Sequence, residues 1–403
     1  MAAGDAAYIK KINRSLIVQK IIERKMISRA DLSKLTSLTR ATISAQAADL
    51  LEDELIVETH LEHYGVGRRP IMLSVNRSAG YTLGIDLDYG LLTFALSDLL
   101  GQPVSTRTVK IEATEYETIL HLLVKHIQLF EKECAESRYG LVGVVIGIHG
   151  LVTKDEIIHY VPRFGWRDIH IKNDLEKATG LPICIENNAN LCSFAERVYE
   201  HHETENLLCA SLYSGIGLGV MMNEEFFKGH DGFAGEVGHT IIMPDGKPCN
   251  CGNYGCWEQY ASESSFFREL SEKKGQSTIS YEDVHQWMQS GDKVVVEMME
   301  QFIYFLSIGL NNLINAYNPE VIVLSSELLQ LNPQSIEQIE CNLKSTISQY
   351  RELSISKLGT KACVLGACAL GIKHFWDVPS MNLSLIKSET SADVTVSERI
   401  QNQ

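Results

Sequence analysis

The sequence predicts an α/β protein whose large body has two similar halves and follows a small helical N-terminal domain. Three observations support this prediction. Helical periodicity fills much of residues 13–52, buried-type strands alternate with helices after residue 81, and a β-rich opening followed by helices occurs twice, near 81 and near 181. The 403 residues are enough for two or three domains, each with its own core.

The composition is that of a soluble globular protein, with 45% apolar and 22% charged residues. No apolar run reaches the roughly 18–20 residues that a membrane span needs, and residues 1–15 contain no apolar signal-peptide core. The ten cysteines then indicate a reducing compartment. We therefore expect a cytoplasmic protein without a membrane partner.

Charge is distributed unevenly along the chain. Residues 1–78 contain 12 Lys and Arg against 9 Asp and Glu, a balance of +3, and the remaining residues have a balance of −18, which gives the net −15. This pattern permits nucleic-acid binding by the N-terminal domain alone and excludes a nucleic-acid groove along the whole body.

Residues 1–78 have the spacing of a helix-turn-helix. Helices are expected over 13–24 and 29–35, the second capped by Ser28, and a third begins near Thr39. The residues of the third helix expected to face inward are Ile43, Ala47, Leu50 and Leu51. Those left outside or near its N-terminal end are short or hydrogen-bonding, as major-groove reading requires. They are Arg40, Thr42, Ser44 and Gln46. A helical bundle that binds another protein is the alternative.

Two short strands, 55–59 and 71–75, are expected to form a β-hairpin after these helices. Arg68 and Arg69 lie at or near its glycine-rich tip. Two arginines on a flexible tip suit a narrow, electronegative minor groove. An isolated Arg-Arg pair is usually only solvated, but behind a helix-turn-helix it favours a winged DNA-binding domain.

The body, residues 79–381, alternates strands and helices. The expected strands are 81–87, 92–99, 104–111, 141–148, 181–187, 207–214, 217–223 and 319–324. The expected helices are 116–133, 189–199, 294–316 and 362–376. We divide the body into lobe 1 (79–187 with 359–381) and lobe 2 (188–358), with a cleft between them, and expect a loose polar tail over 382–403.

Three segments of the body have the composition of phosphate-binding turns. Gly84–Asp86 ends a strand, and Ser214–Gly219 is a glycine-rich turn whose backbone amides could bind an anion. Pro319–Leu324 leads to a turn suited to adenine. An ordinary hairpin is the alternative for a lone glycine-rich turn.

The segment Gly235–Glu258 carries the most specific chemical motif. Its candidate metal ligands are His239, Cys249, Cys251 and Cys256. Three thiolates and an imidazole suit tetrahedral Zn²⁺, and the intervening glycines and prolines let the loop curl around it. Such a zinc ion would be structural, because four protein ligands leave no position for an activating water. The alternative is an ordinary loop with unligated cysteines, although a polar, glycine-rich loop is a poor core segment.

Five motifs together resemble the ROK family (repressors, open reading frames and sugar kinases), and in particular its xylose and N-acetylglucosamine repressors. They are GEVGH (235–239), CNCGNYGCWE (249–258), IENNAN (185–190), SGIGLGV (214–220) and GRRP (67–70). The resemblance covers about residues 13–376. It implies a two-lobed, actin/hexokinase-like (ribonuclease H-like) α/β body behind an N-terminal winged helix-turn-helix, with a sugar bound in the cleft between the lobes.

The same resemblance implies which residues contact the sugar. They are Asn187, Glu236, His239, Glu258 and Gly150. Carboxylates and amides suit this task, because each can bind two neighbouring hydroxyls. The histidine resembles a bridge that has one ring nitrogen on zinc and the other toward the sugar.

The chain departs from the family's kinases in ways that argue against catalysis. Asn188 stands where the kinases have the aspartate that takes the proton from the sugar hydroxyl, and an amide cannot act as a general base. Asp88 and Tyr89 bring charge and bulk to the first phosphate turn. Ser325–Glu327 replaces a paired glycine after the strand 319–324. We therefore expect a binding protein and no enzyme.

The sequence-based hypothesis is a sugar-responsive repressor of carbohydrate-utilisation genes, with xylose as the first choice of effector. It would bind operator DNA as a homodimer, with pairing of dimers into a tetramer left open. The alternative is an ATP-dependent ROK sugar kinase with an appended DNA-binding domain. A third possibility is a regulator whose effector is a protein.

Overall fold

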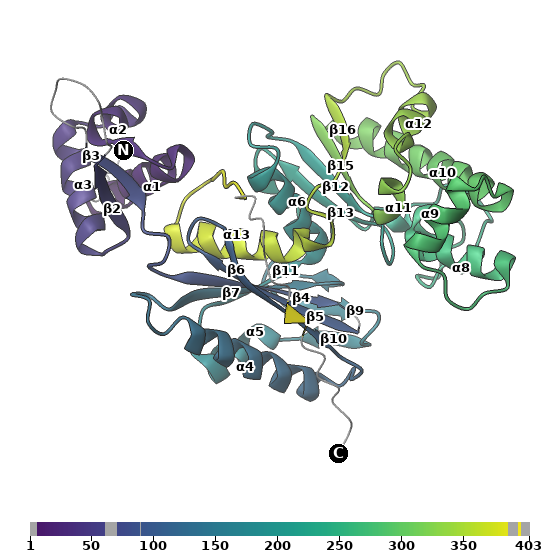
Figure 1. The fold of residues 1–403 in the computed structure, drawn as a ribbon, viewed down its shortest axis with the longest axis horizontal. Helices are drawn as coiled ribbons and strands as arrows, with labels where there is room; N and C mark the ends of the chain where they lie inside the picture. Colours follow the sequence, from purple (N-terminus) through teal and green to yellow (C-terminus); the bar gives the residue numbers. More distant parts are fainter. Residues whose placement is uncertain (1–5, 61–70, 89, 386–393, 396–403) are drawn as a thin grey trace. The chain divides into compact units, whose positions relative to one another are not determined.

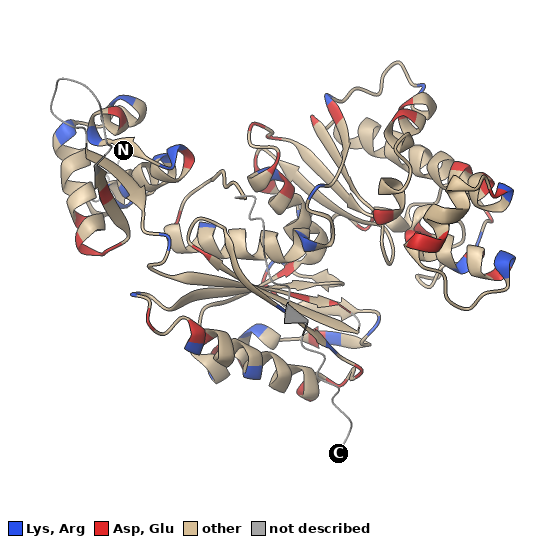
Figure 2. Ribbon diagram, viewed as in Figure 1, with Lys and Arg blue, Asp and Glu red and all other residues tan. Residues whose placement is uncertain are grey.

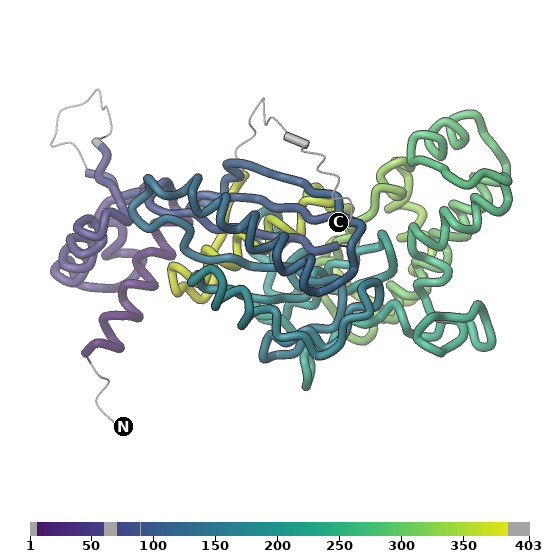
Figure 3. The backbone as a smooth tube through the Cα atoms, turned by 90° about the horizontal axis from the view of Figure 1, so that it is seen from below, coloured from purple at the N-terminus to yellow at the C-terminus, as the bar shows by residue number. Residues whose placement is uncertain are grey.

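The computed structural model describes residues 6–60, 71–88, 90–385 and 394–395 (Figures 1 and 3). The chain divides into two compact units. The first comprises Met1–Asn187, Val198–His202 and Cys363–Gln403, and the second comprises Asn188–Arg197 and Glu203–Ala362. The chain therefore enters the second unit at Asn188, passes back through the first unit at Val198–His202, and returns to it at Cys363.

Three helices open the first unit. They are α1 (Ala6–Arg24), α2 (Arg29–Thr36) and α3 (Arg40–Glu52). The predicted cap of α2 is confirmed, because the hydroxyl of Ser28 accepts a hydrogen bond from the amide of Asp31. Thr39 caps α3 in the same way, through the amide of Thr42. These side chains replace partners that the first turn of a helix lacks, so each helix begins at a defined residue.

Gln46 does not face outward as the sequence analysis expected. Its side chain is only 5% exposed, whereas Arg40 and Ser44 are exposed. Positions 43, 46, 47 and 50 fall on one face of a helix that turns about 100° per residue, so this glutamine lies on the core face. Its Oε1 accepts no hydrogen bond from any described residue.

Three short strands pack with these helices as an antiparallel sheet in the order β1-β3-β2. They are β1 (Ile27–Ser28), β2 (Ile56–His60) and β3 (Ile71–Val75). Ile56 pairs with Val75 and His60 with Ile71, so β2 and β3 pair antiparallel, as expected for the two strands of a hairpin. Its connection, residues 61–70, lies outside the described part of the chain, and so do Arg68 and Arg69.

A mixed six-stranded sheet forms the body of the first unit, in the order β11-β7-β4-β5-β6-β17 (Figure 1). Its strands are β4 (Tyr81–Asp88), β5 (Leu91–Asp98), β6 (Pro103–Lys110), β7 (Leu141–Ile148), β11 (Ile183–Asn187) and β17 (Val394–Thr395). The strands β4, β7 and β11 are parallel to one another. Their carboxyl ends therefore meet at one edge, which brings together Asp86, His149 and Asn187.

Helices cover both faces of this sheet. Figure 1 shows α4 (Tyr116–Glu133) and α5 (Ile171–Thr179) on one face and α13 (Ala362–Trp376) on the other. Gly84 allows the close approach of α13, because a Cβ atom there would lie 2.3 Å from the carbonyl oxygen of Val364. A small antiparallel sheet, which the sequence analysis missed, follows β7. Its strands are β8 (Leu151–Val152), β9 (Ile158–Val161) and β10 (Trp166–Ile169).

The second unit contains a five-stranded sheet in the order β14-β13-β12-β15-β16. Its strands are β12 (Leu207–Ser211), β13 (Gly217–Met222), β14 (Glu225–Phe226), β15 (Val321–Ser325) and β16 (Glu352–Ile355). Its helices are α6 (Asn188–Tyr199), α7 (Glu258–Ala261), α8 (Glu263–Lys274), α9 (Tyr281–Gln289), α10 (Lys293–Tyr317), α11 (Glu327–Gln330) and α12 (Ser335–Asn342). The helix α10 is long and apolar enough to cross a membrane. However, half of its most apolar 18-residue stretch is buried, and its buried side chains belong to the core of this unit.

The segment after α13 joins the N-terminal helices to the body of the first unit. Asp377 pairs with Lys11 at 2.8 Å, and its carbonyl oxygen accepts a hydrogen bond from the Ser15 hydroxyl at 2.7 Å. Farther along, Leu383 is only 3% exposed and its amide donates to the carbonyl oxygen of Val198. The expected loose tail therefore does not begin at residue 382, and β17 within it pairs with β6.

We predict that Gly309→Ala destabilises the protein. Replacing glycine by alanine inside a helix ordinarily stabilises it by about 0.5–1 kcal/mol. Here the new methyl group would lie 2.0 Å from an indole carbon of Trp257, which is buried between α7 and α10. Thermal and urea unfolding should therefore show lower stability, and an unchanged or raised melting temperature would contradict this packing.

Candidate functional site

The candidate site is built on the irregular segment between β14 and α7. A 3₁₀ turn, Val237–His239, precedes a loop in which Ile241 pairs with Cys256 and Pro248 with Tyr254 as isolated antiparallel bridges. Gly255 makes this fold-back possible, because its φ is +80° and a Cβ atom would lie 1.7 Å from the carbonyl oxygen of Met243. The two bridges return the end of the loop to its beginning.

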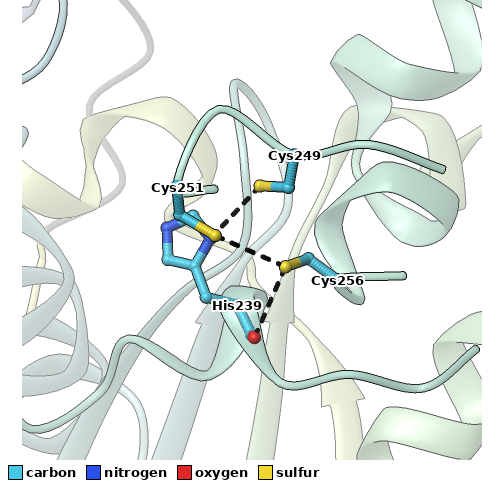
Figure 4. Close-up of side chains that lie close together, drawn as sticks. All are labelled: His239, Cys249, Cys251 and Cys256. Carbon is cyan, nitrogen blue, oxygen red and sulfur yellow. Dashed lines mark hydrogen bonds between the residues drawn. The ribbon is translucent and has the colours of Figure 1, made fainter. Parts of the chain in front are cut away.

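This fold-back gathers His239, Cys249, Cys251 and Cys256, whose potential ligand atoms all lie within 4.8 Å of one another (Figure 4). The Sγ atoms of Cys251 and Cys256 are 3.6 Å apart, and Cys249 Sγ is 3.5 Å from His239 Nδ1. A tetrahedral zinc site with ordinary bond lengths requires separations of about 3.8 Å between sulfurs and about 3.5 Å between sulfur and nitrogen. The four residues therefore fit a tetrahedral metal ion.

The thiols of this cluster differ in their proton affinity. Burial and hydrogen bonding raise the pKa of Cys249 to about 12 in the metal-free loop. Although desolvation also acts on Cys251, hydrogen bonds from its neighbours lower the pKa of that thiol. Metal binding must release the protons of the ligand thiols, and the cation supplies the charge that offsets their burial.

Two carboxylates flank the histidine. His239 Nε2 lies 4.0 Å from Glu236 Oε2, and its Nδ1 lies 3.5 Å from Glu258 Oε1. Partial burial raises the pKa of Glu236, against the opposing effect of His239 and together with the like charge of Glu258. The imidazole thus has one nitrogen toward the cysteines and the other toward a half-exposed carboxylate.

Neighbouring elements hold Glu258 in place. The buried side chain of Trp257 donates from Nε1 to the carbonyl oxygen of Phe305 on α10 at 2.9 Å. The Glu258 carbonyl oxygen accepts from the Ser262 hydroxyl at 2.7 Å. The glycine-rich turn between β12 and β13 passes over the carboxylate, since a Cβ atom on Gly215 would lie 2.9 Å from Glu258 Oε2. Polar groups of the turn, the loop and α7 therefore converge on one place in the second unit.

The other two residues predicted to contact the sugar, Asn187 and Gly150, belong to the first unit. Asn187 Nδ2 donates to the carbonyl oxygen of Gly150 at 2.9 Å, so these two residues lie together at the edge where β7 and β11 end. Gly150 has no room for a side chain, because a Cβ atom would lie 2.4 Å from the carbonyl oxygen of Tyr160. The segment after β7 is thereby held against β9.

His149, which the sequence analysis did not select, lies at the same edge. Its Nε2 is 2.8 Å from Asp86 Oδ1, and its Nδ1 is 3.7 Å from Asp88 Oδ1. Burial lowers the pKa of the imidazole, but the combined effect of the two aspartates is larger and raises it. The parallel pairing of β4 and β7 was the signal that could have identified this group. Tyr89, which follows Asp88 in the sequence, lies outside the described part of the chain.

Residues 82–374 match the family model described as "ROK family". A curated xylose repressor of Bacillus spizizenii is 34% identical over 386 residues, which cover 94% of this chain and 100% of that protein. A glucokinase of Halalkalibacterium halodurans is 30% identical over 251 residues, which cover 57% of this chain and 76% of that protein. Among solved structures, a ROK family transcriptional regulator, a homologue of the E. coli MLC protein, superposes with a TM-score of 0.79 at 28% identity, over 92% of this chain and 97% of its own.

We predict that protonated His149 stabilises the first unit. Because the folded-state pKa is raised, this contribution is fully present below the unfolded value of about 6.5 and is lost as the pH rises through the folded value. The melting temperature of the wild type should therefore fall as the pH rises above about 6.5. His149→Asn should remove part of that slope. An unchanged slope would contradict the assignment, and His121→Asn, which removes an exposed histidine of α4, serves as the control.

Proposed function

The chain belongs to the ROK family, and on this basis we propose that it is a sugar-responsive transcriptional repressor of carbohydrate-utilisation genes. The predicted fold class, an actin/hexokinase-like α/β body behind an N-terminal winged helix-turn-helix, agrees with this membership. One observation carries the proposal. His239 has one ring nitrogen beside three cysteines and the other beside Glu236, so a metal-binding cluster and a hydroxyl-binding group share a side chain.

We propose that the cluster holds a structural Zn²⁺ ion through His239, Cys249, Cys251 and Cys256. The separations of the ligand atoms and the three-thiolate, one-imidazole chemistry support zinc. Zinc on Nδ1 would leave Nε2 protonated and able to donate a hydrogen bond toward Glu236 or a bound hydroxyl. The ion would therefore fix both the shape of the loop and the tautomer of the histidine.

The proposed effector is a sugar, with xylose as the first candidate because a xylose repressor is 34% identical over nearly the whole chain. Glu236 and Glu258 would accept hydrogen bonds from neighbouring hydroxyls, and His239 would donate one. Asn187 and Gly150 are the proposed contacts from the first unit. The hydrogen bond from Asn187 to the Gly150 carbonyl oxygen supports a shared role, since it fixes the orientation of the asparagine amide.

The proposed DNA contacts are Arg40, Thr42 and Ser44 at the start of α3, with Arg68 and Arg69 in the hairpin connection. Basic and acidic residues are interspersed over the N-terminal helices (Figure 2), and most of the lysines and arginines pair with acidic neighbours. Arg40 is exposed and forms no ion pair within the described residues. It is thus available for phosphate or base contacts. We propose a homodimer for binding to paired half-sites, and a tetramer stays open.

The second candidate function is sugar phosphorylation, which similarity to a glucokinase favours. Three features of this chain weigh against it. Asn188 offers no general base. Asp86 and Asp88 form a cluster with His149 and present carboxylates to an approaching phosphate. After β15, the carboxylate of Glu263 accepts hydrogen bonds from Ser326 Oγ at 2.6 Å and from the Leu328 amide at 2.8 Å, so these two donors are already engaged within the protein.

The proposal is tested by measuring DNA binding with and without sugar. Duplexes are selected from a random library with the full-length protein and then titrated by fluorescence anisotropy. D-xylose should change the affinity by roughly 5–150-fold, while hexoses and sugar phosphates should act more weakly. Arg40→Ala should weaken binding more than Arg24→Ala, which removes the same charge from the exposed end of α1. No selected sequence, or turnover of ATP with the same sugars, would count against a repressor.

We also predict that Cys251→Ser lowers both metal content and sugar affinity. Serine is a poor ligand for zinc, so the loop should lose the constraint that holds Glu236 and Glu258 around His239. Zinc is measured by atomic emission and sugar binding by calorimetry. Cys341→Ser is the matched control, since Cys341 is another exposed cysteine of the same unit and lies outside the cluster. Undiminished sugar affinity in the metal-free variant would separate the loop from the sugar site.

A further inference from the structure

A metal ligand and a proposed sugar ligand are in direct contact in this site. The Cys249 thiol donates to Glu258 Oε1 over a distance of 3.2 Å. A cysteine bound to a metal ion is a thiolate and has no proton to donate. Metal binding would therefore remove the proton that joins the Cys249 sulfur to the Glu258 oxygen, and a shared donor is required to keep these two acceptors in contact.

Gln259 supplies such a donor. Its Nε2 lies 3.7 Å from Cys249 Sγ and 3.4 Å from Glu258 Oε1. A carboxamide nitrogen carries two hydrogens, so one can be donated to the sulfur and the other to the carboxylate. The half-buried position of this side chain limits competition from water for both acceptors.

The orientation of this amide is fixed from the opposite side. Arg268, on α8, donates from Nη2 to Gln259 Oε1 at 3.1 Å. A guanidinium only donates hydrogen bonds, so it selects the oxygen of the carboxamide and turns the NH₂ group toward Cys249 and Glu258. The loop, α7 and α8 all belong to the second unit, so this chain of contacts lies within one compact body.

We propose that Gln259 is a positioning residue that bridges the metal-bound thiolate of Cys249 and the carboxylate of Glu258. This inference rests on the proposed function for its sugar-binding half, whereas its metal-binding half stands on the contacts alone. With the bridge in place, the carboxylate keeps its position beside His239 after the thiol has lost its proton. Without the bridge, the metal-bound sulfur and the Glu258 oxygen face each other with no donor between them.

The test compares zinc affinity in the full-length protein by competition with a chromophoric chelator. Gln259→Leu removes both donors, and its zinc affinity should fall about 10–100-fold, as is typical when a hydrogen bond to a ligand is lost. Gln286→Leu is the matched control, because that exposed glutamine of α9 bonds Glu282, at 3.0 Å. Arg268→Ala should cause a smaller loss.

A double-mutant cycle distinguishes a bridge from general disruption of the loop. If Gln259 separates two negative charges, Glu258→Leu should restore zinc affinity in the Gln259→Leu background. Additive losses, or unchanged affinity in Gln259→Leu, would overturn the proposal. The cycle measures only zinc affinity, so it tests the bridge even if the wild type binds no sugar. Absence of sugar binding would instead reject the proposed effector site.

Discussion

The convergence of His239, Cys249, Cys251 and Cys256 is the constraint on which the site depends. The loop between them contains no regular helix or strand, and few of its side chains are buried, so packing alone gives it little reason to hold one shape. Ligand atoms within 4.8 Å of one another replace that missing core, provided a cation offsets the charge of three thiolates. One end of the constraint is His239, three residues after Glu236, and the other is Cys256, two residues before Glu258. Closing the cluster therefore brings both carboxylates to one imidazole.

The edge of the sheet in the first unit gathers polar groups that interact with one another. Parallel pairing of β4, β7 and β11 delivers polar groups to one edge whatever their chemistry. Here the groups are an aspartate–histidine–aspartate cluster and an asparagine that bonds a backbone carbonyl. These groups satisfy one another and raise the pKa of His149. A general base needs an acceptor that is left free for the substrate proton, whereas Asp86 already contacts His149.

The sequence analysis was accurate where a long hydrophobic pattern defines a helix or strand, and it failed where the element is short or depends on tertiary contacts. The bounds of α4, β7 and α13 agree with the predicted ranges, because long apolar patterns with a single period decide them. The strands β8, β9 and β10 have two to four residues and offer no period to detect. Gln46 was misplaced because polarity was given more weight than its position on the helix. His149 and Gln259 escaped notice because each acquires its partners only through tertiary contacts, from β4 in one case and from α8 and the loop in the other.

The residues predicted to contact the sugar come from both units of the chain. Asn187 and Gly150 belong to one unit, and Glu236, His239 and Glu258 belong to the other. Within the first unit, Asp377 directly follows α13 and contacts α1 through Lys11 and Ser15. The segment after α13 therefore contacts α1 directly. Exposed ion pairs of this kind contribute little stability, so the Lys11–Asp377 pair adds little to the stability of this joint.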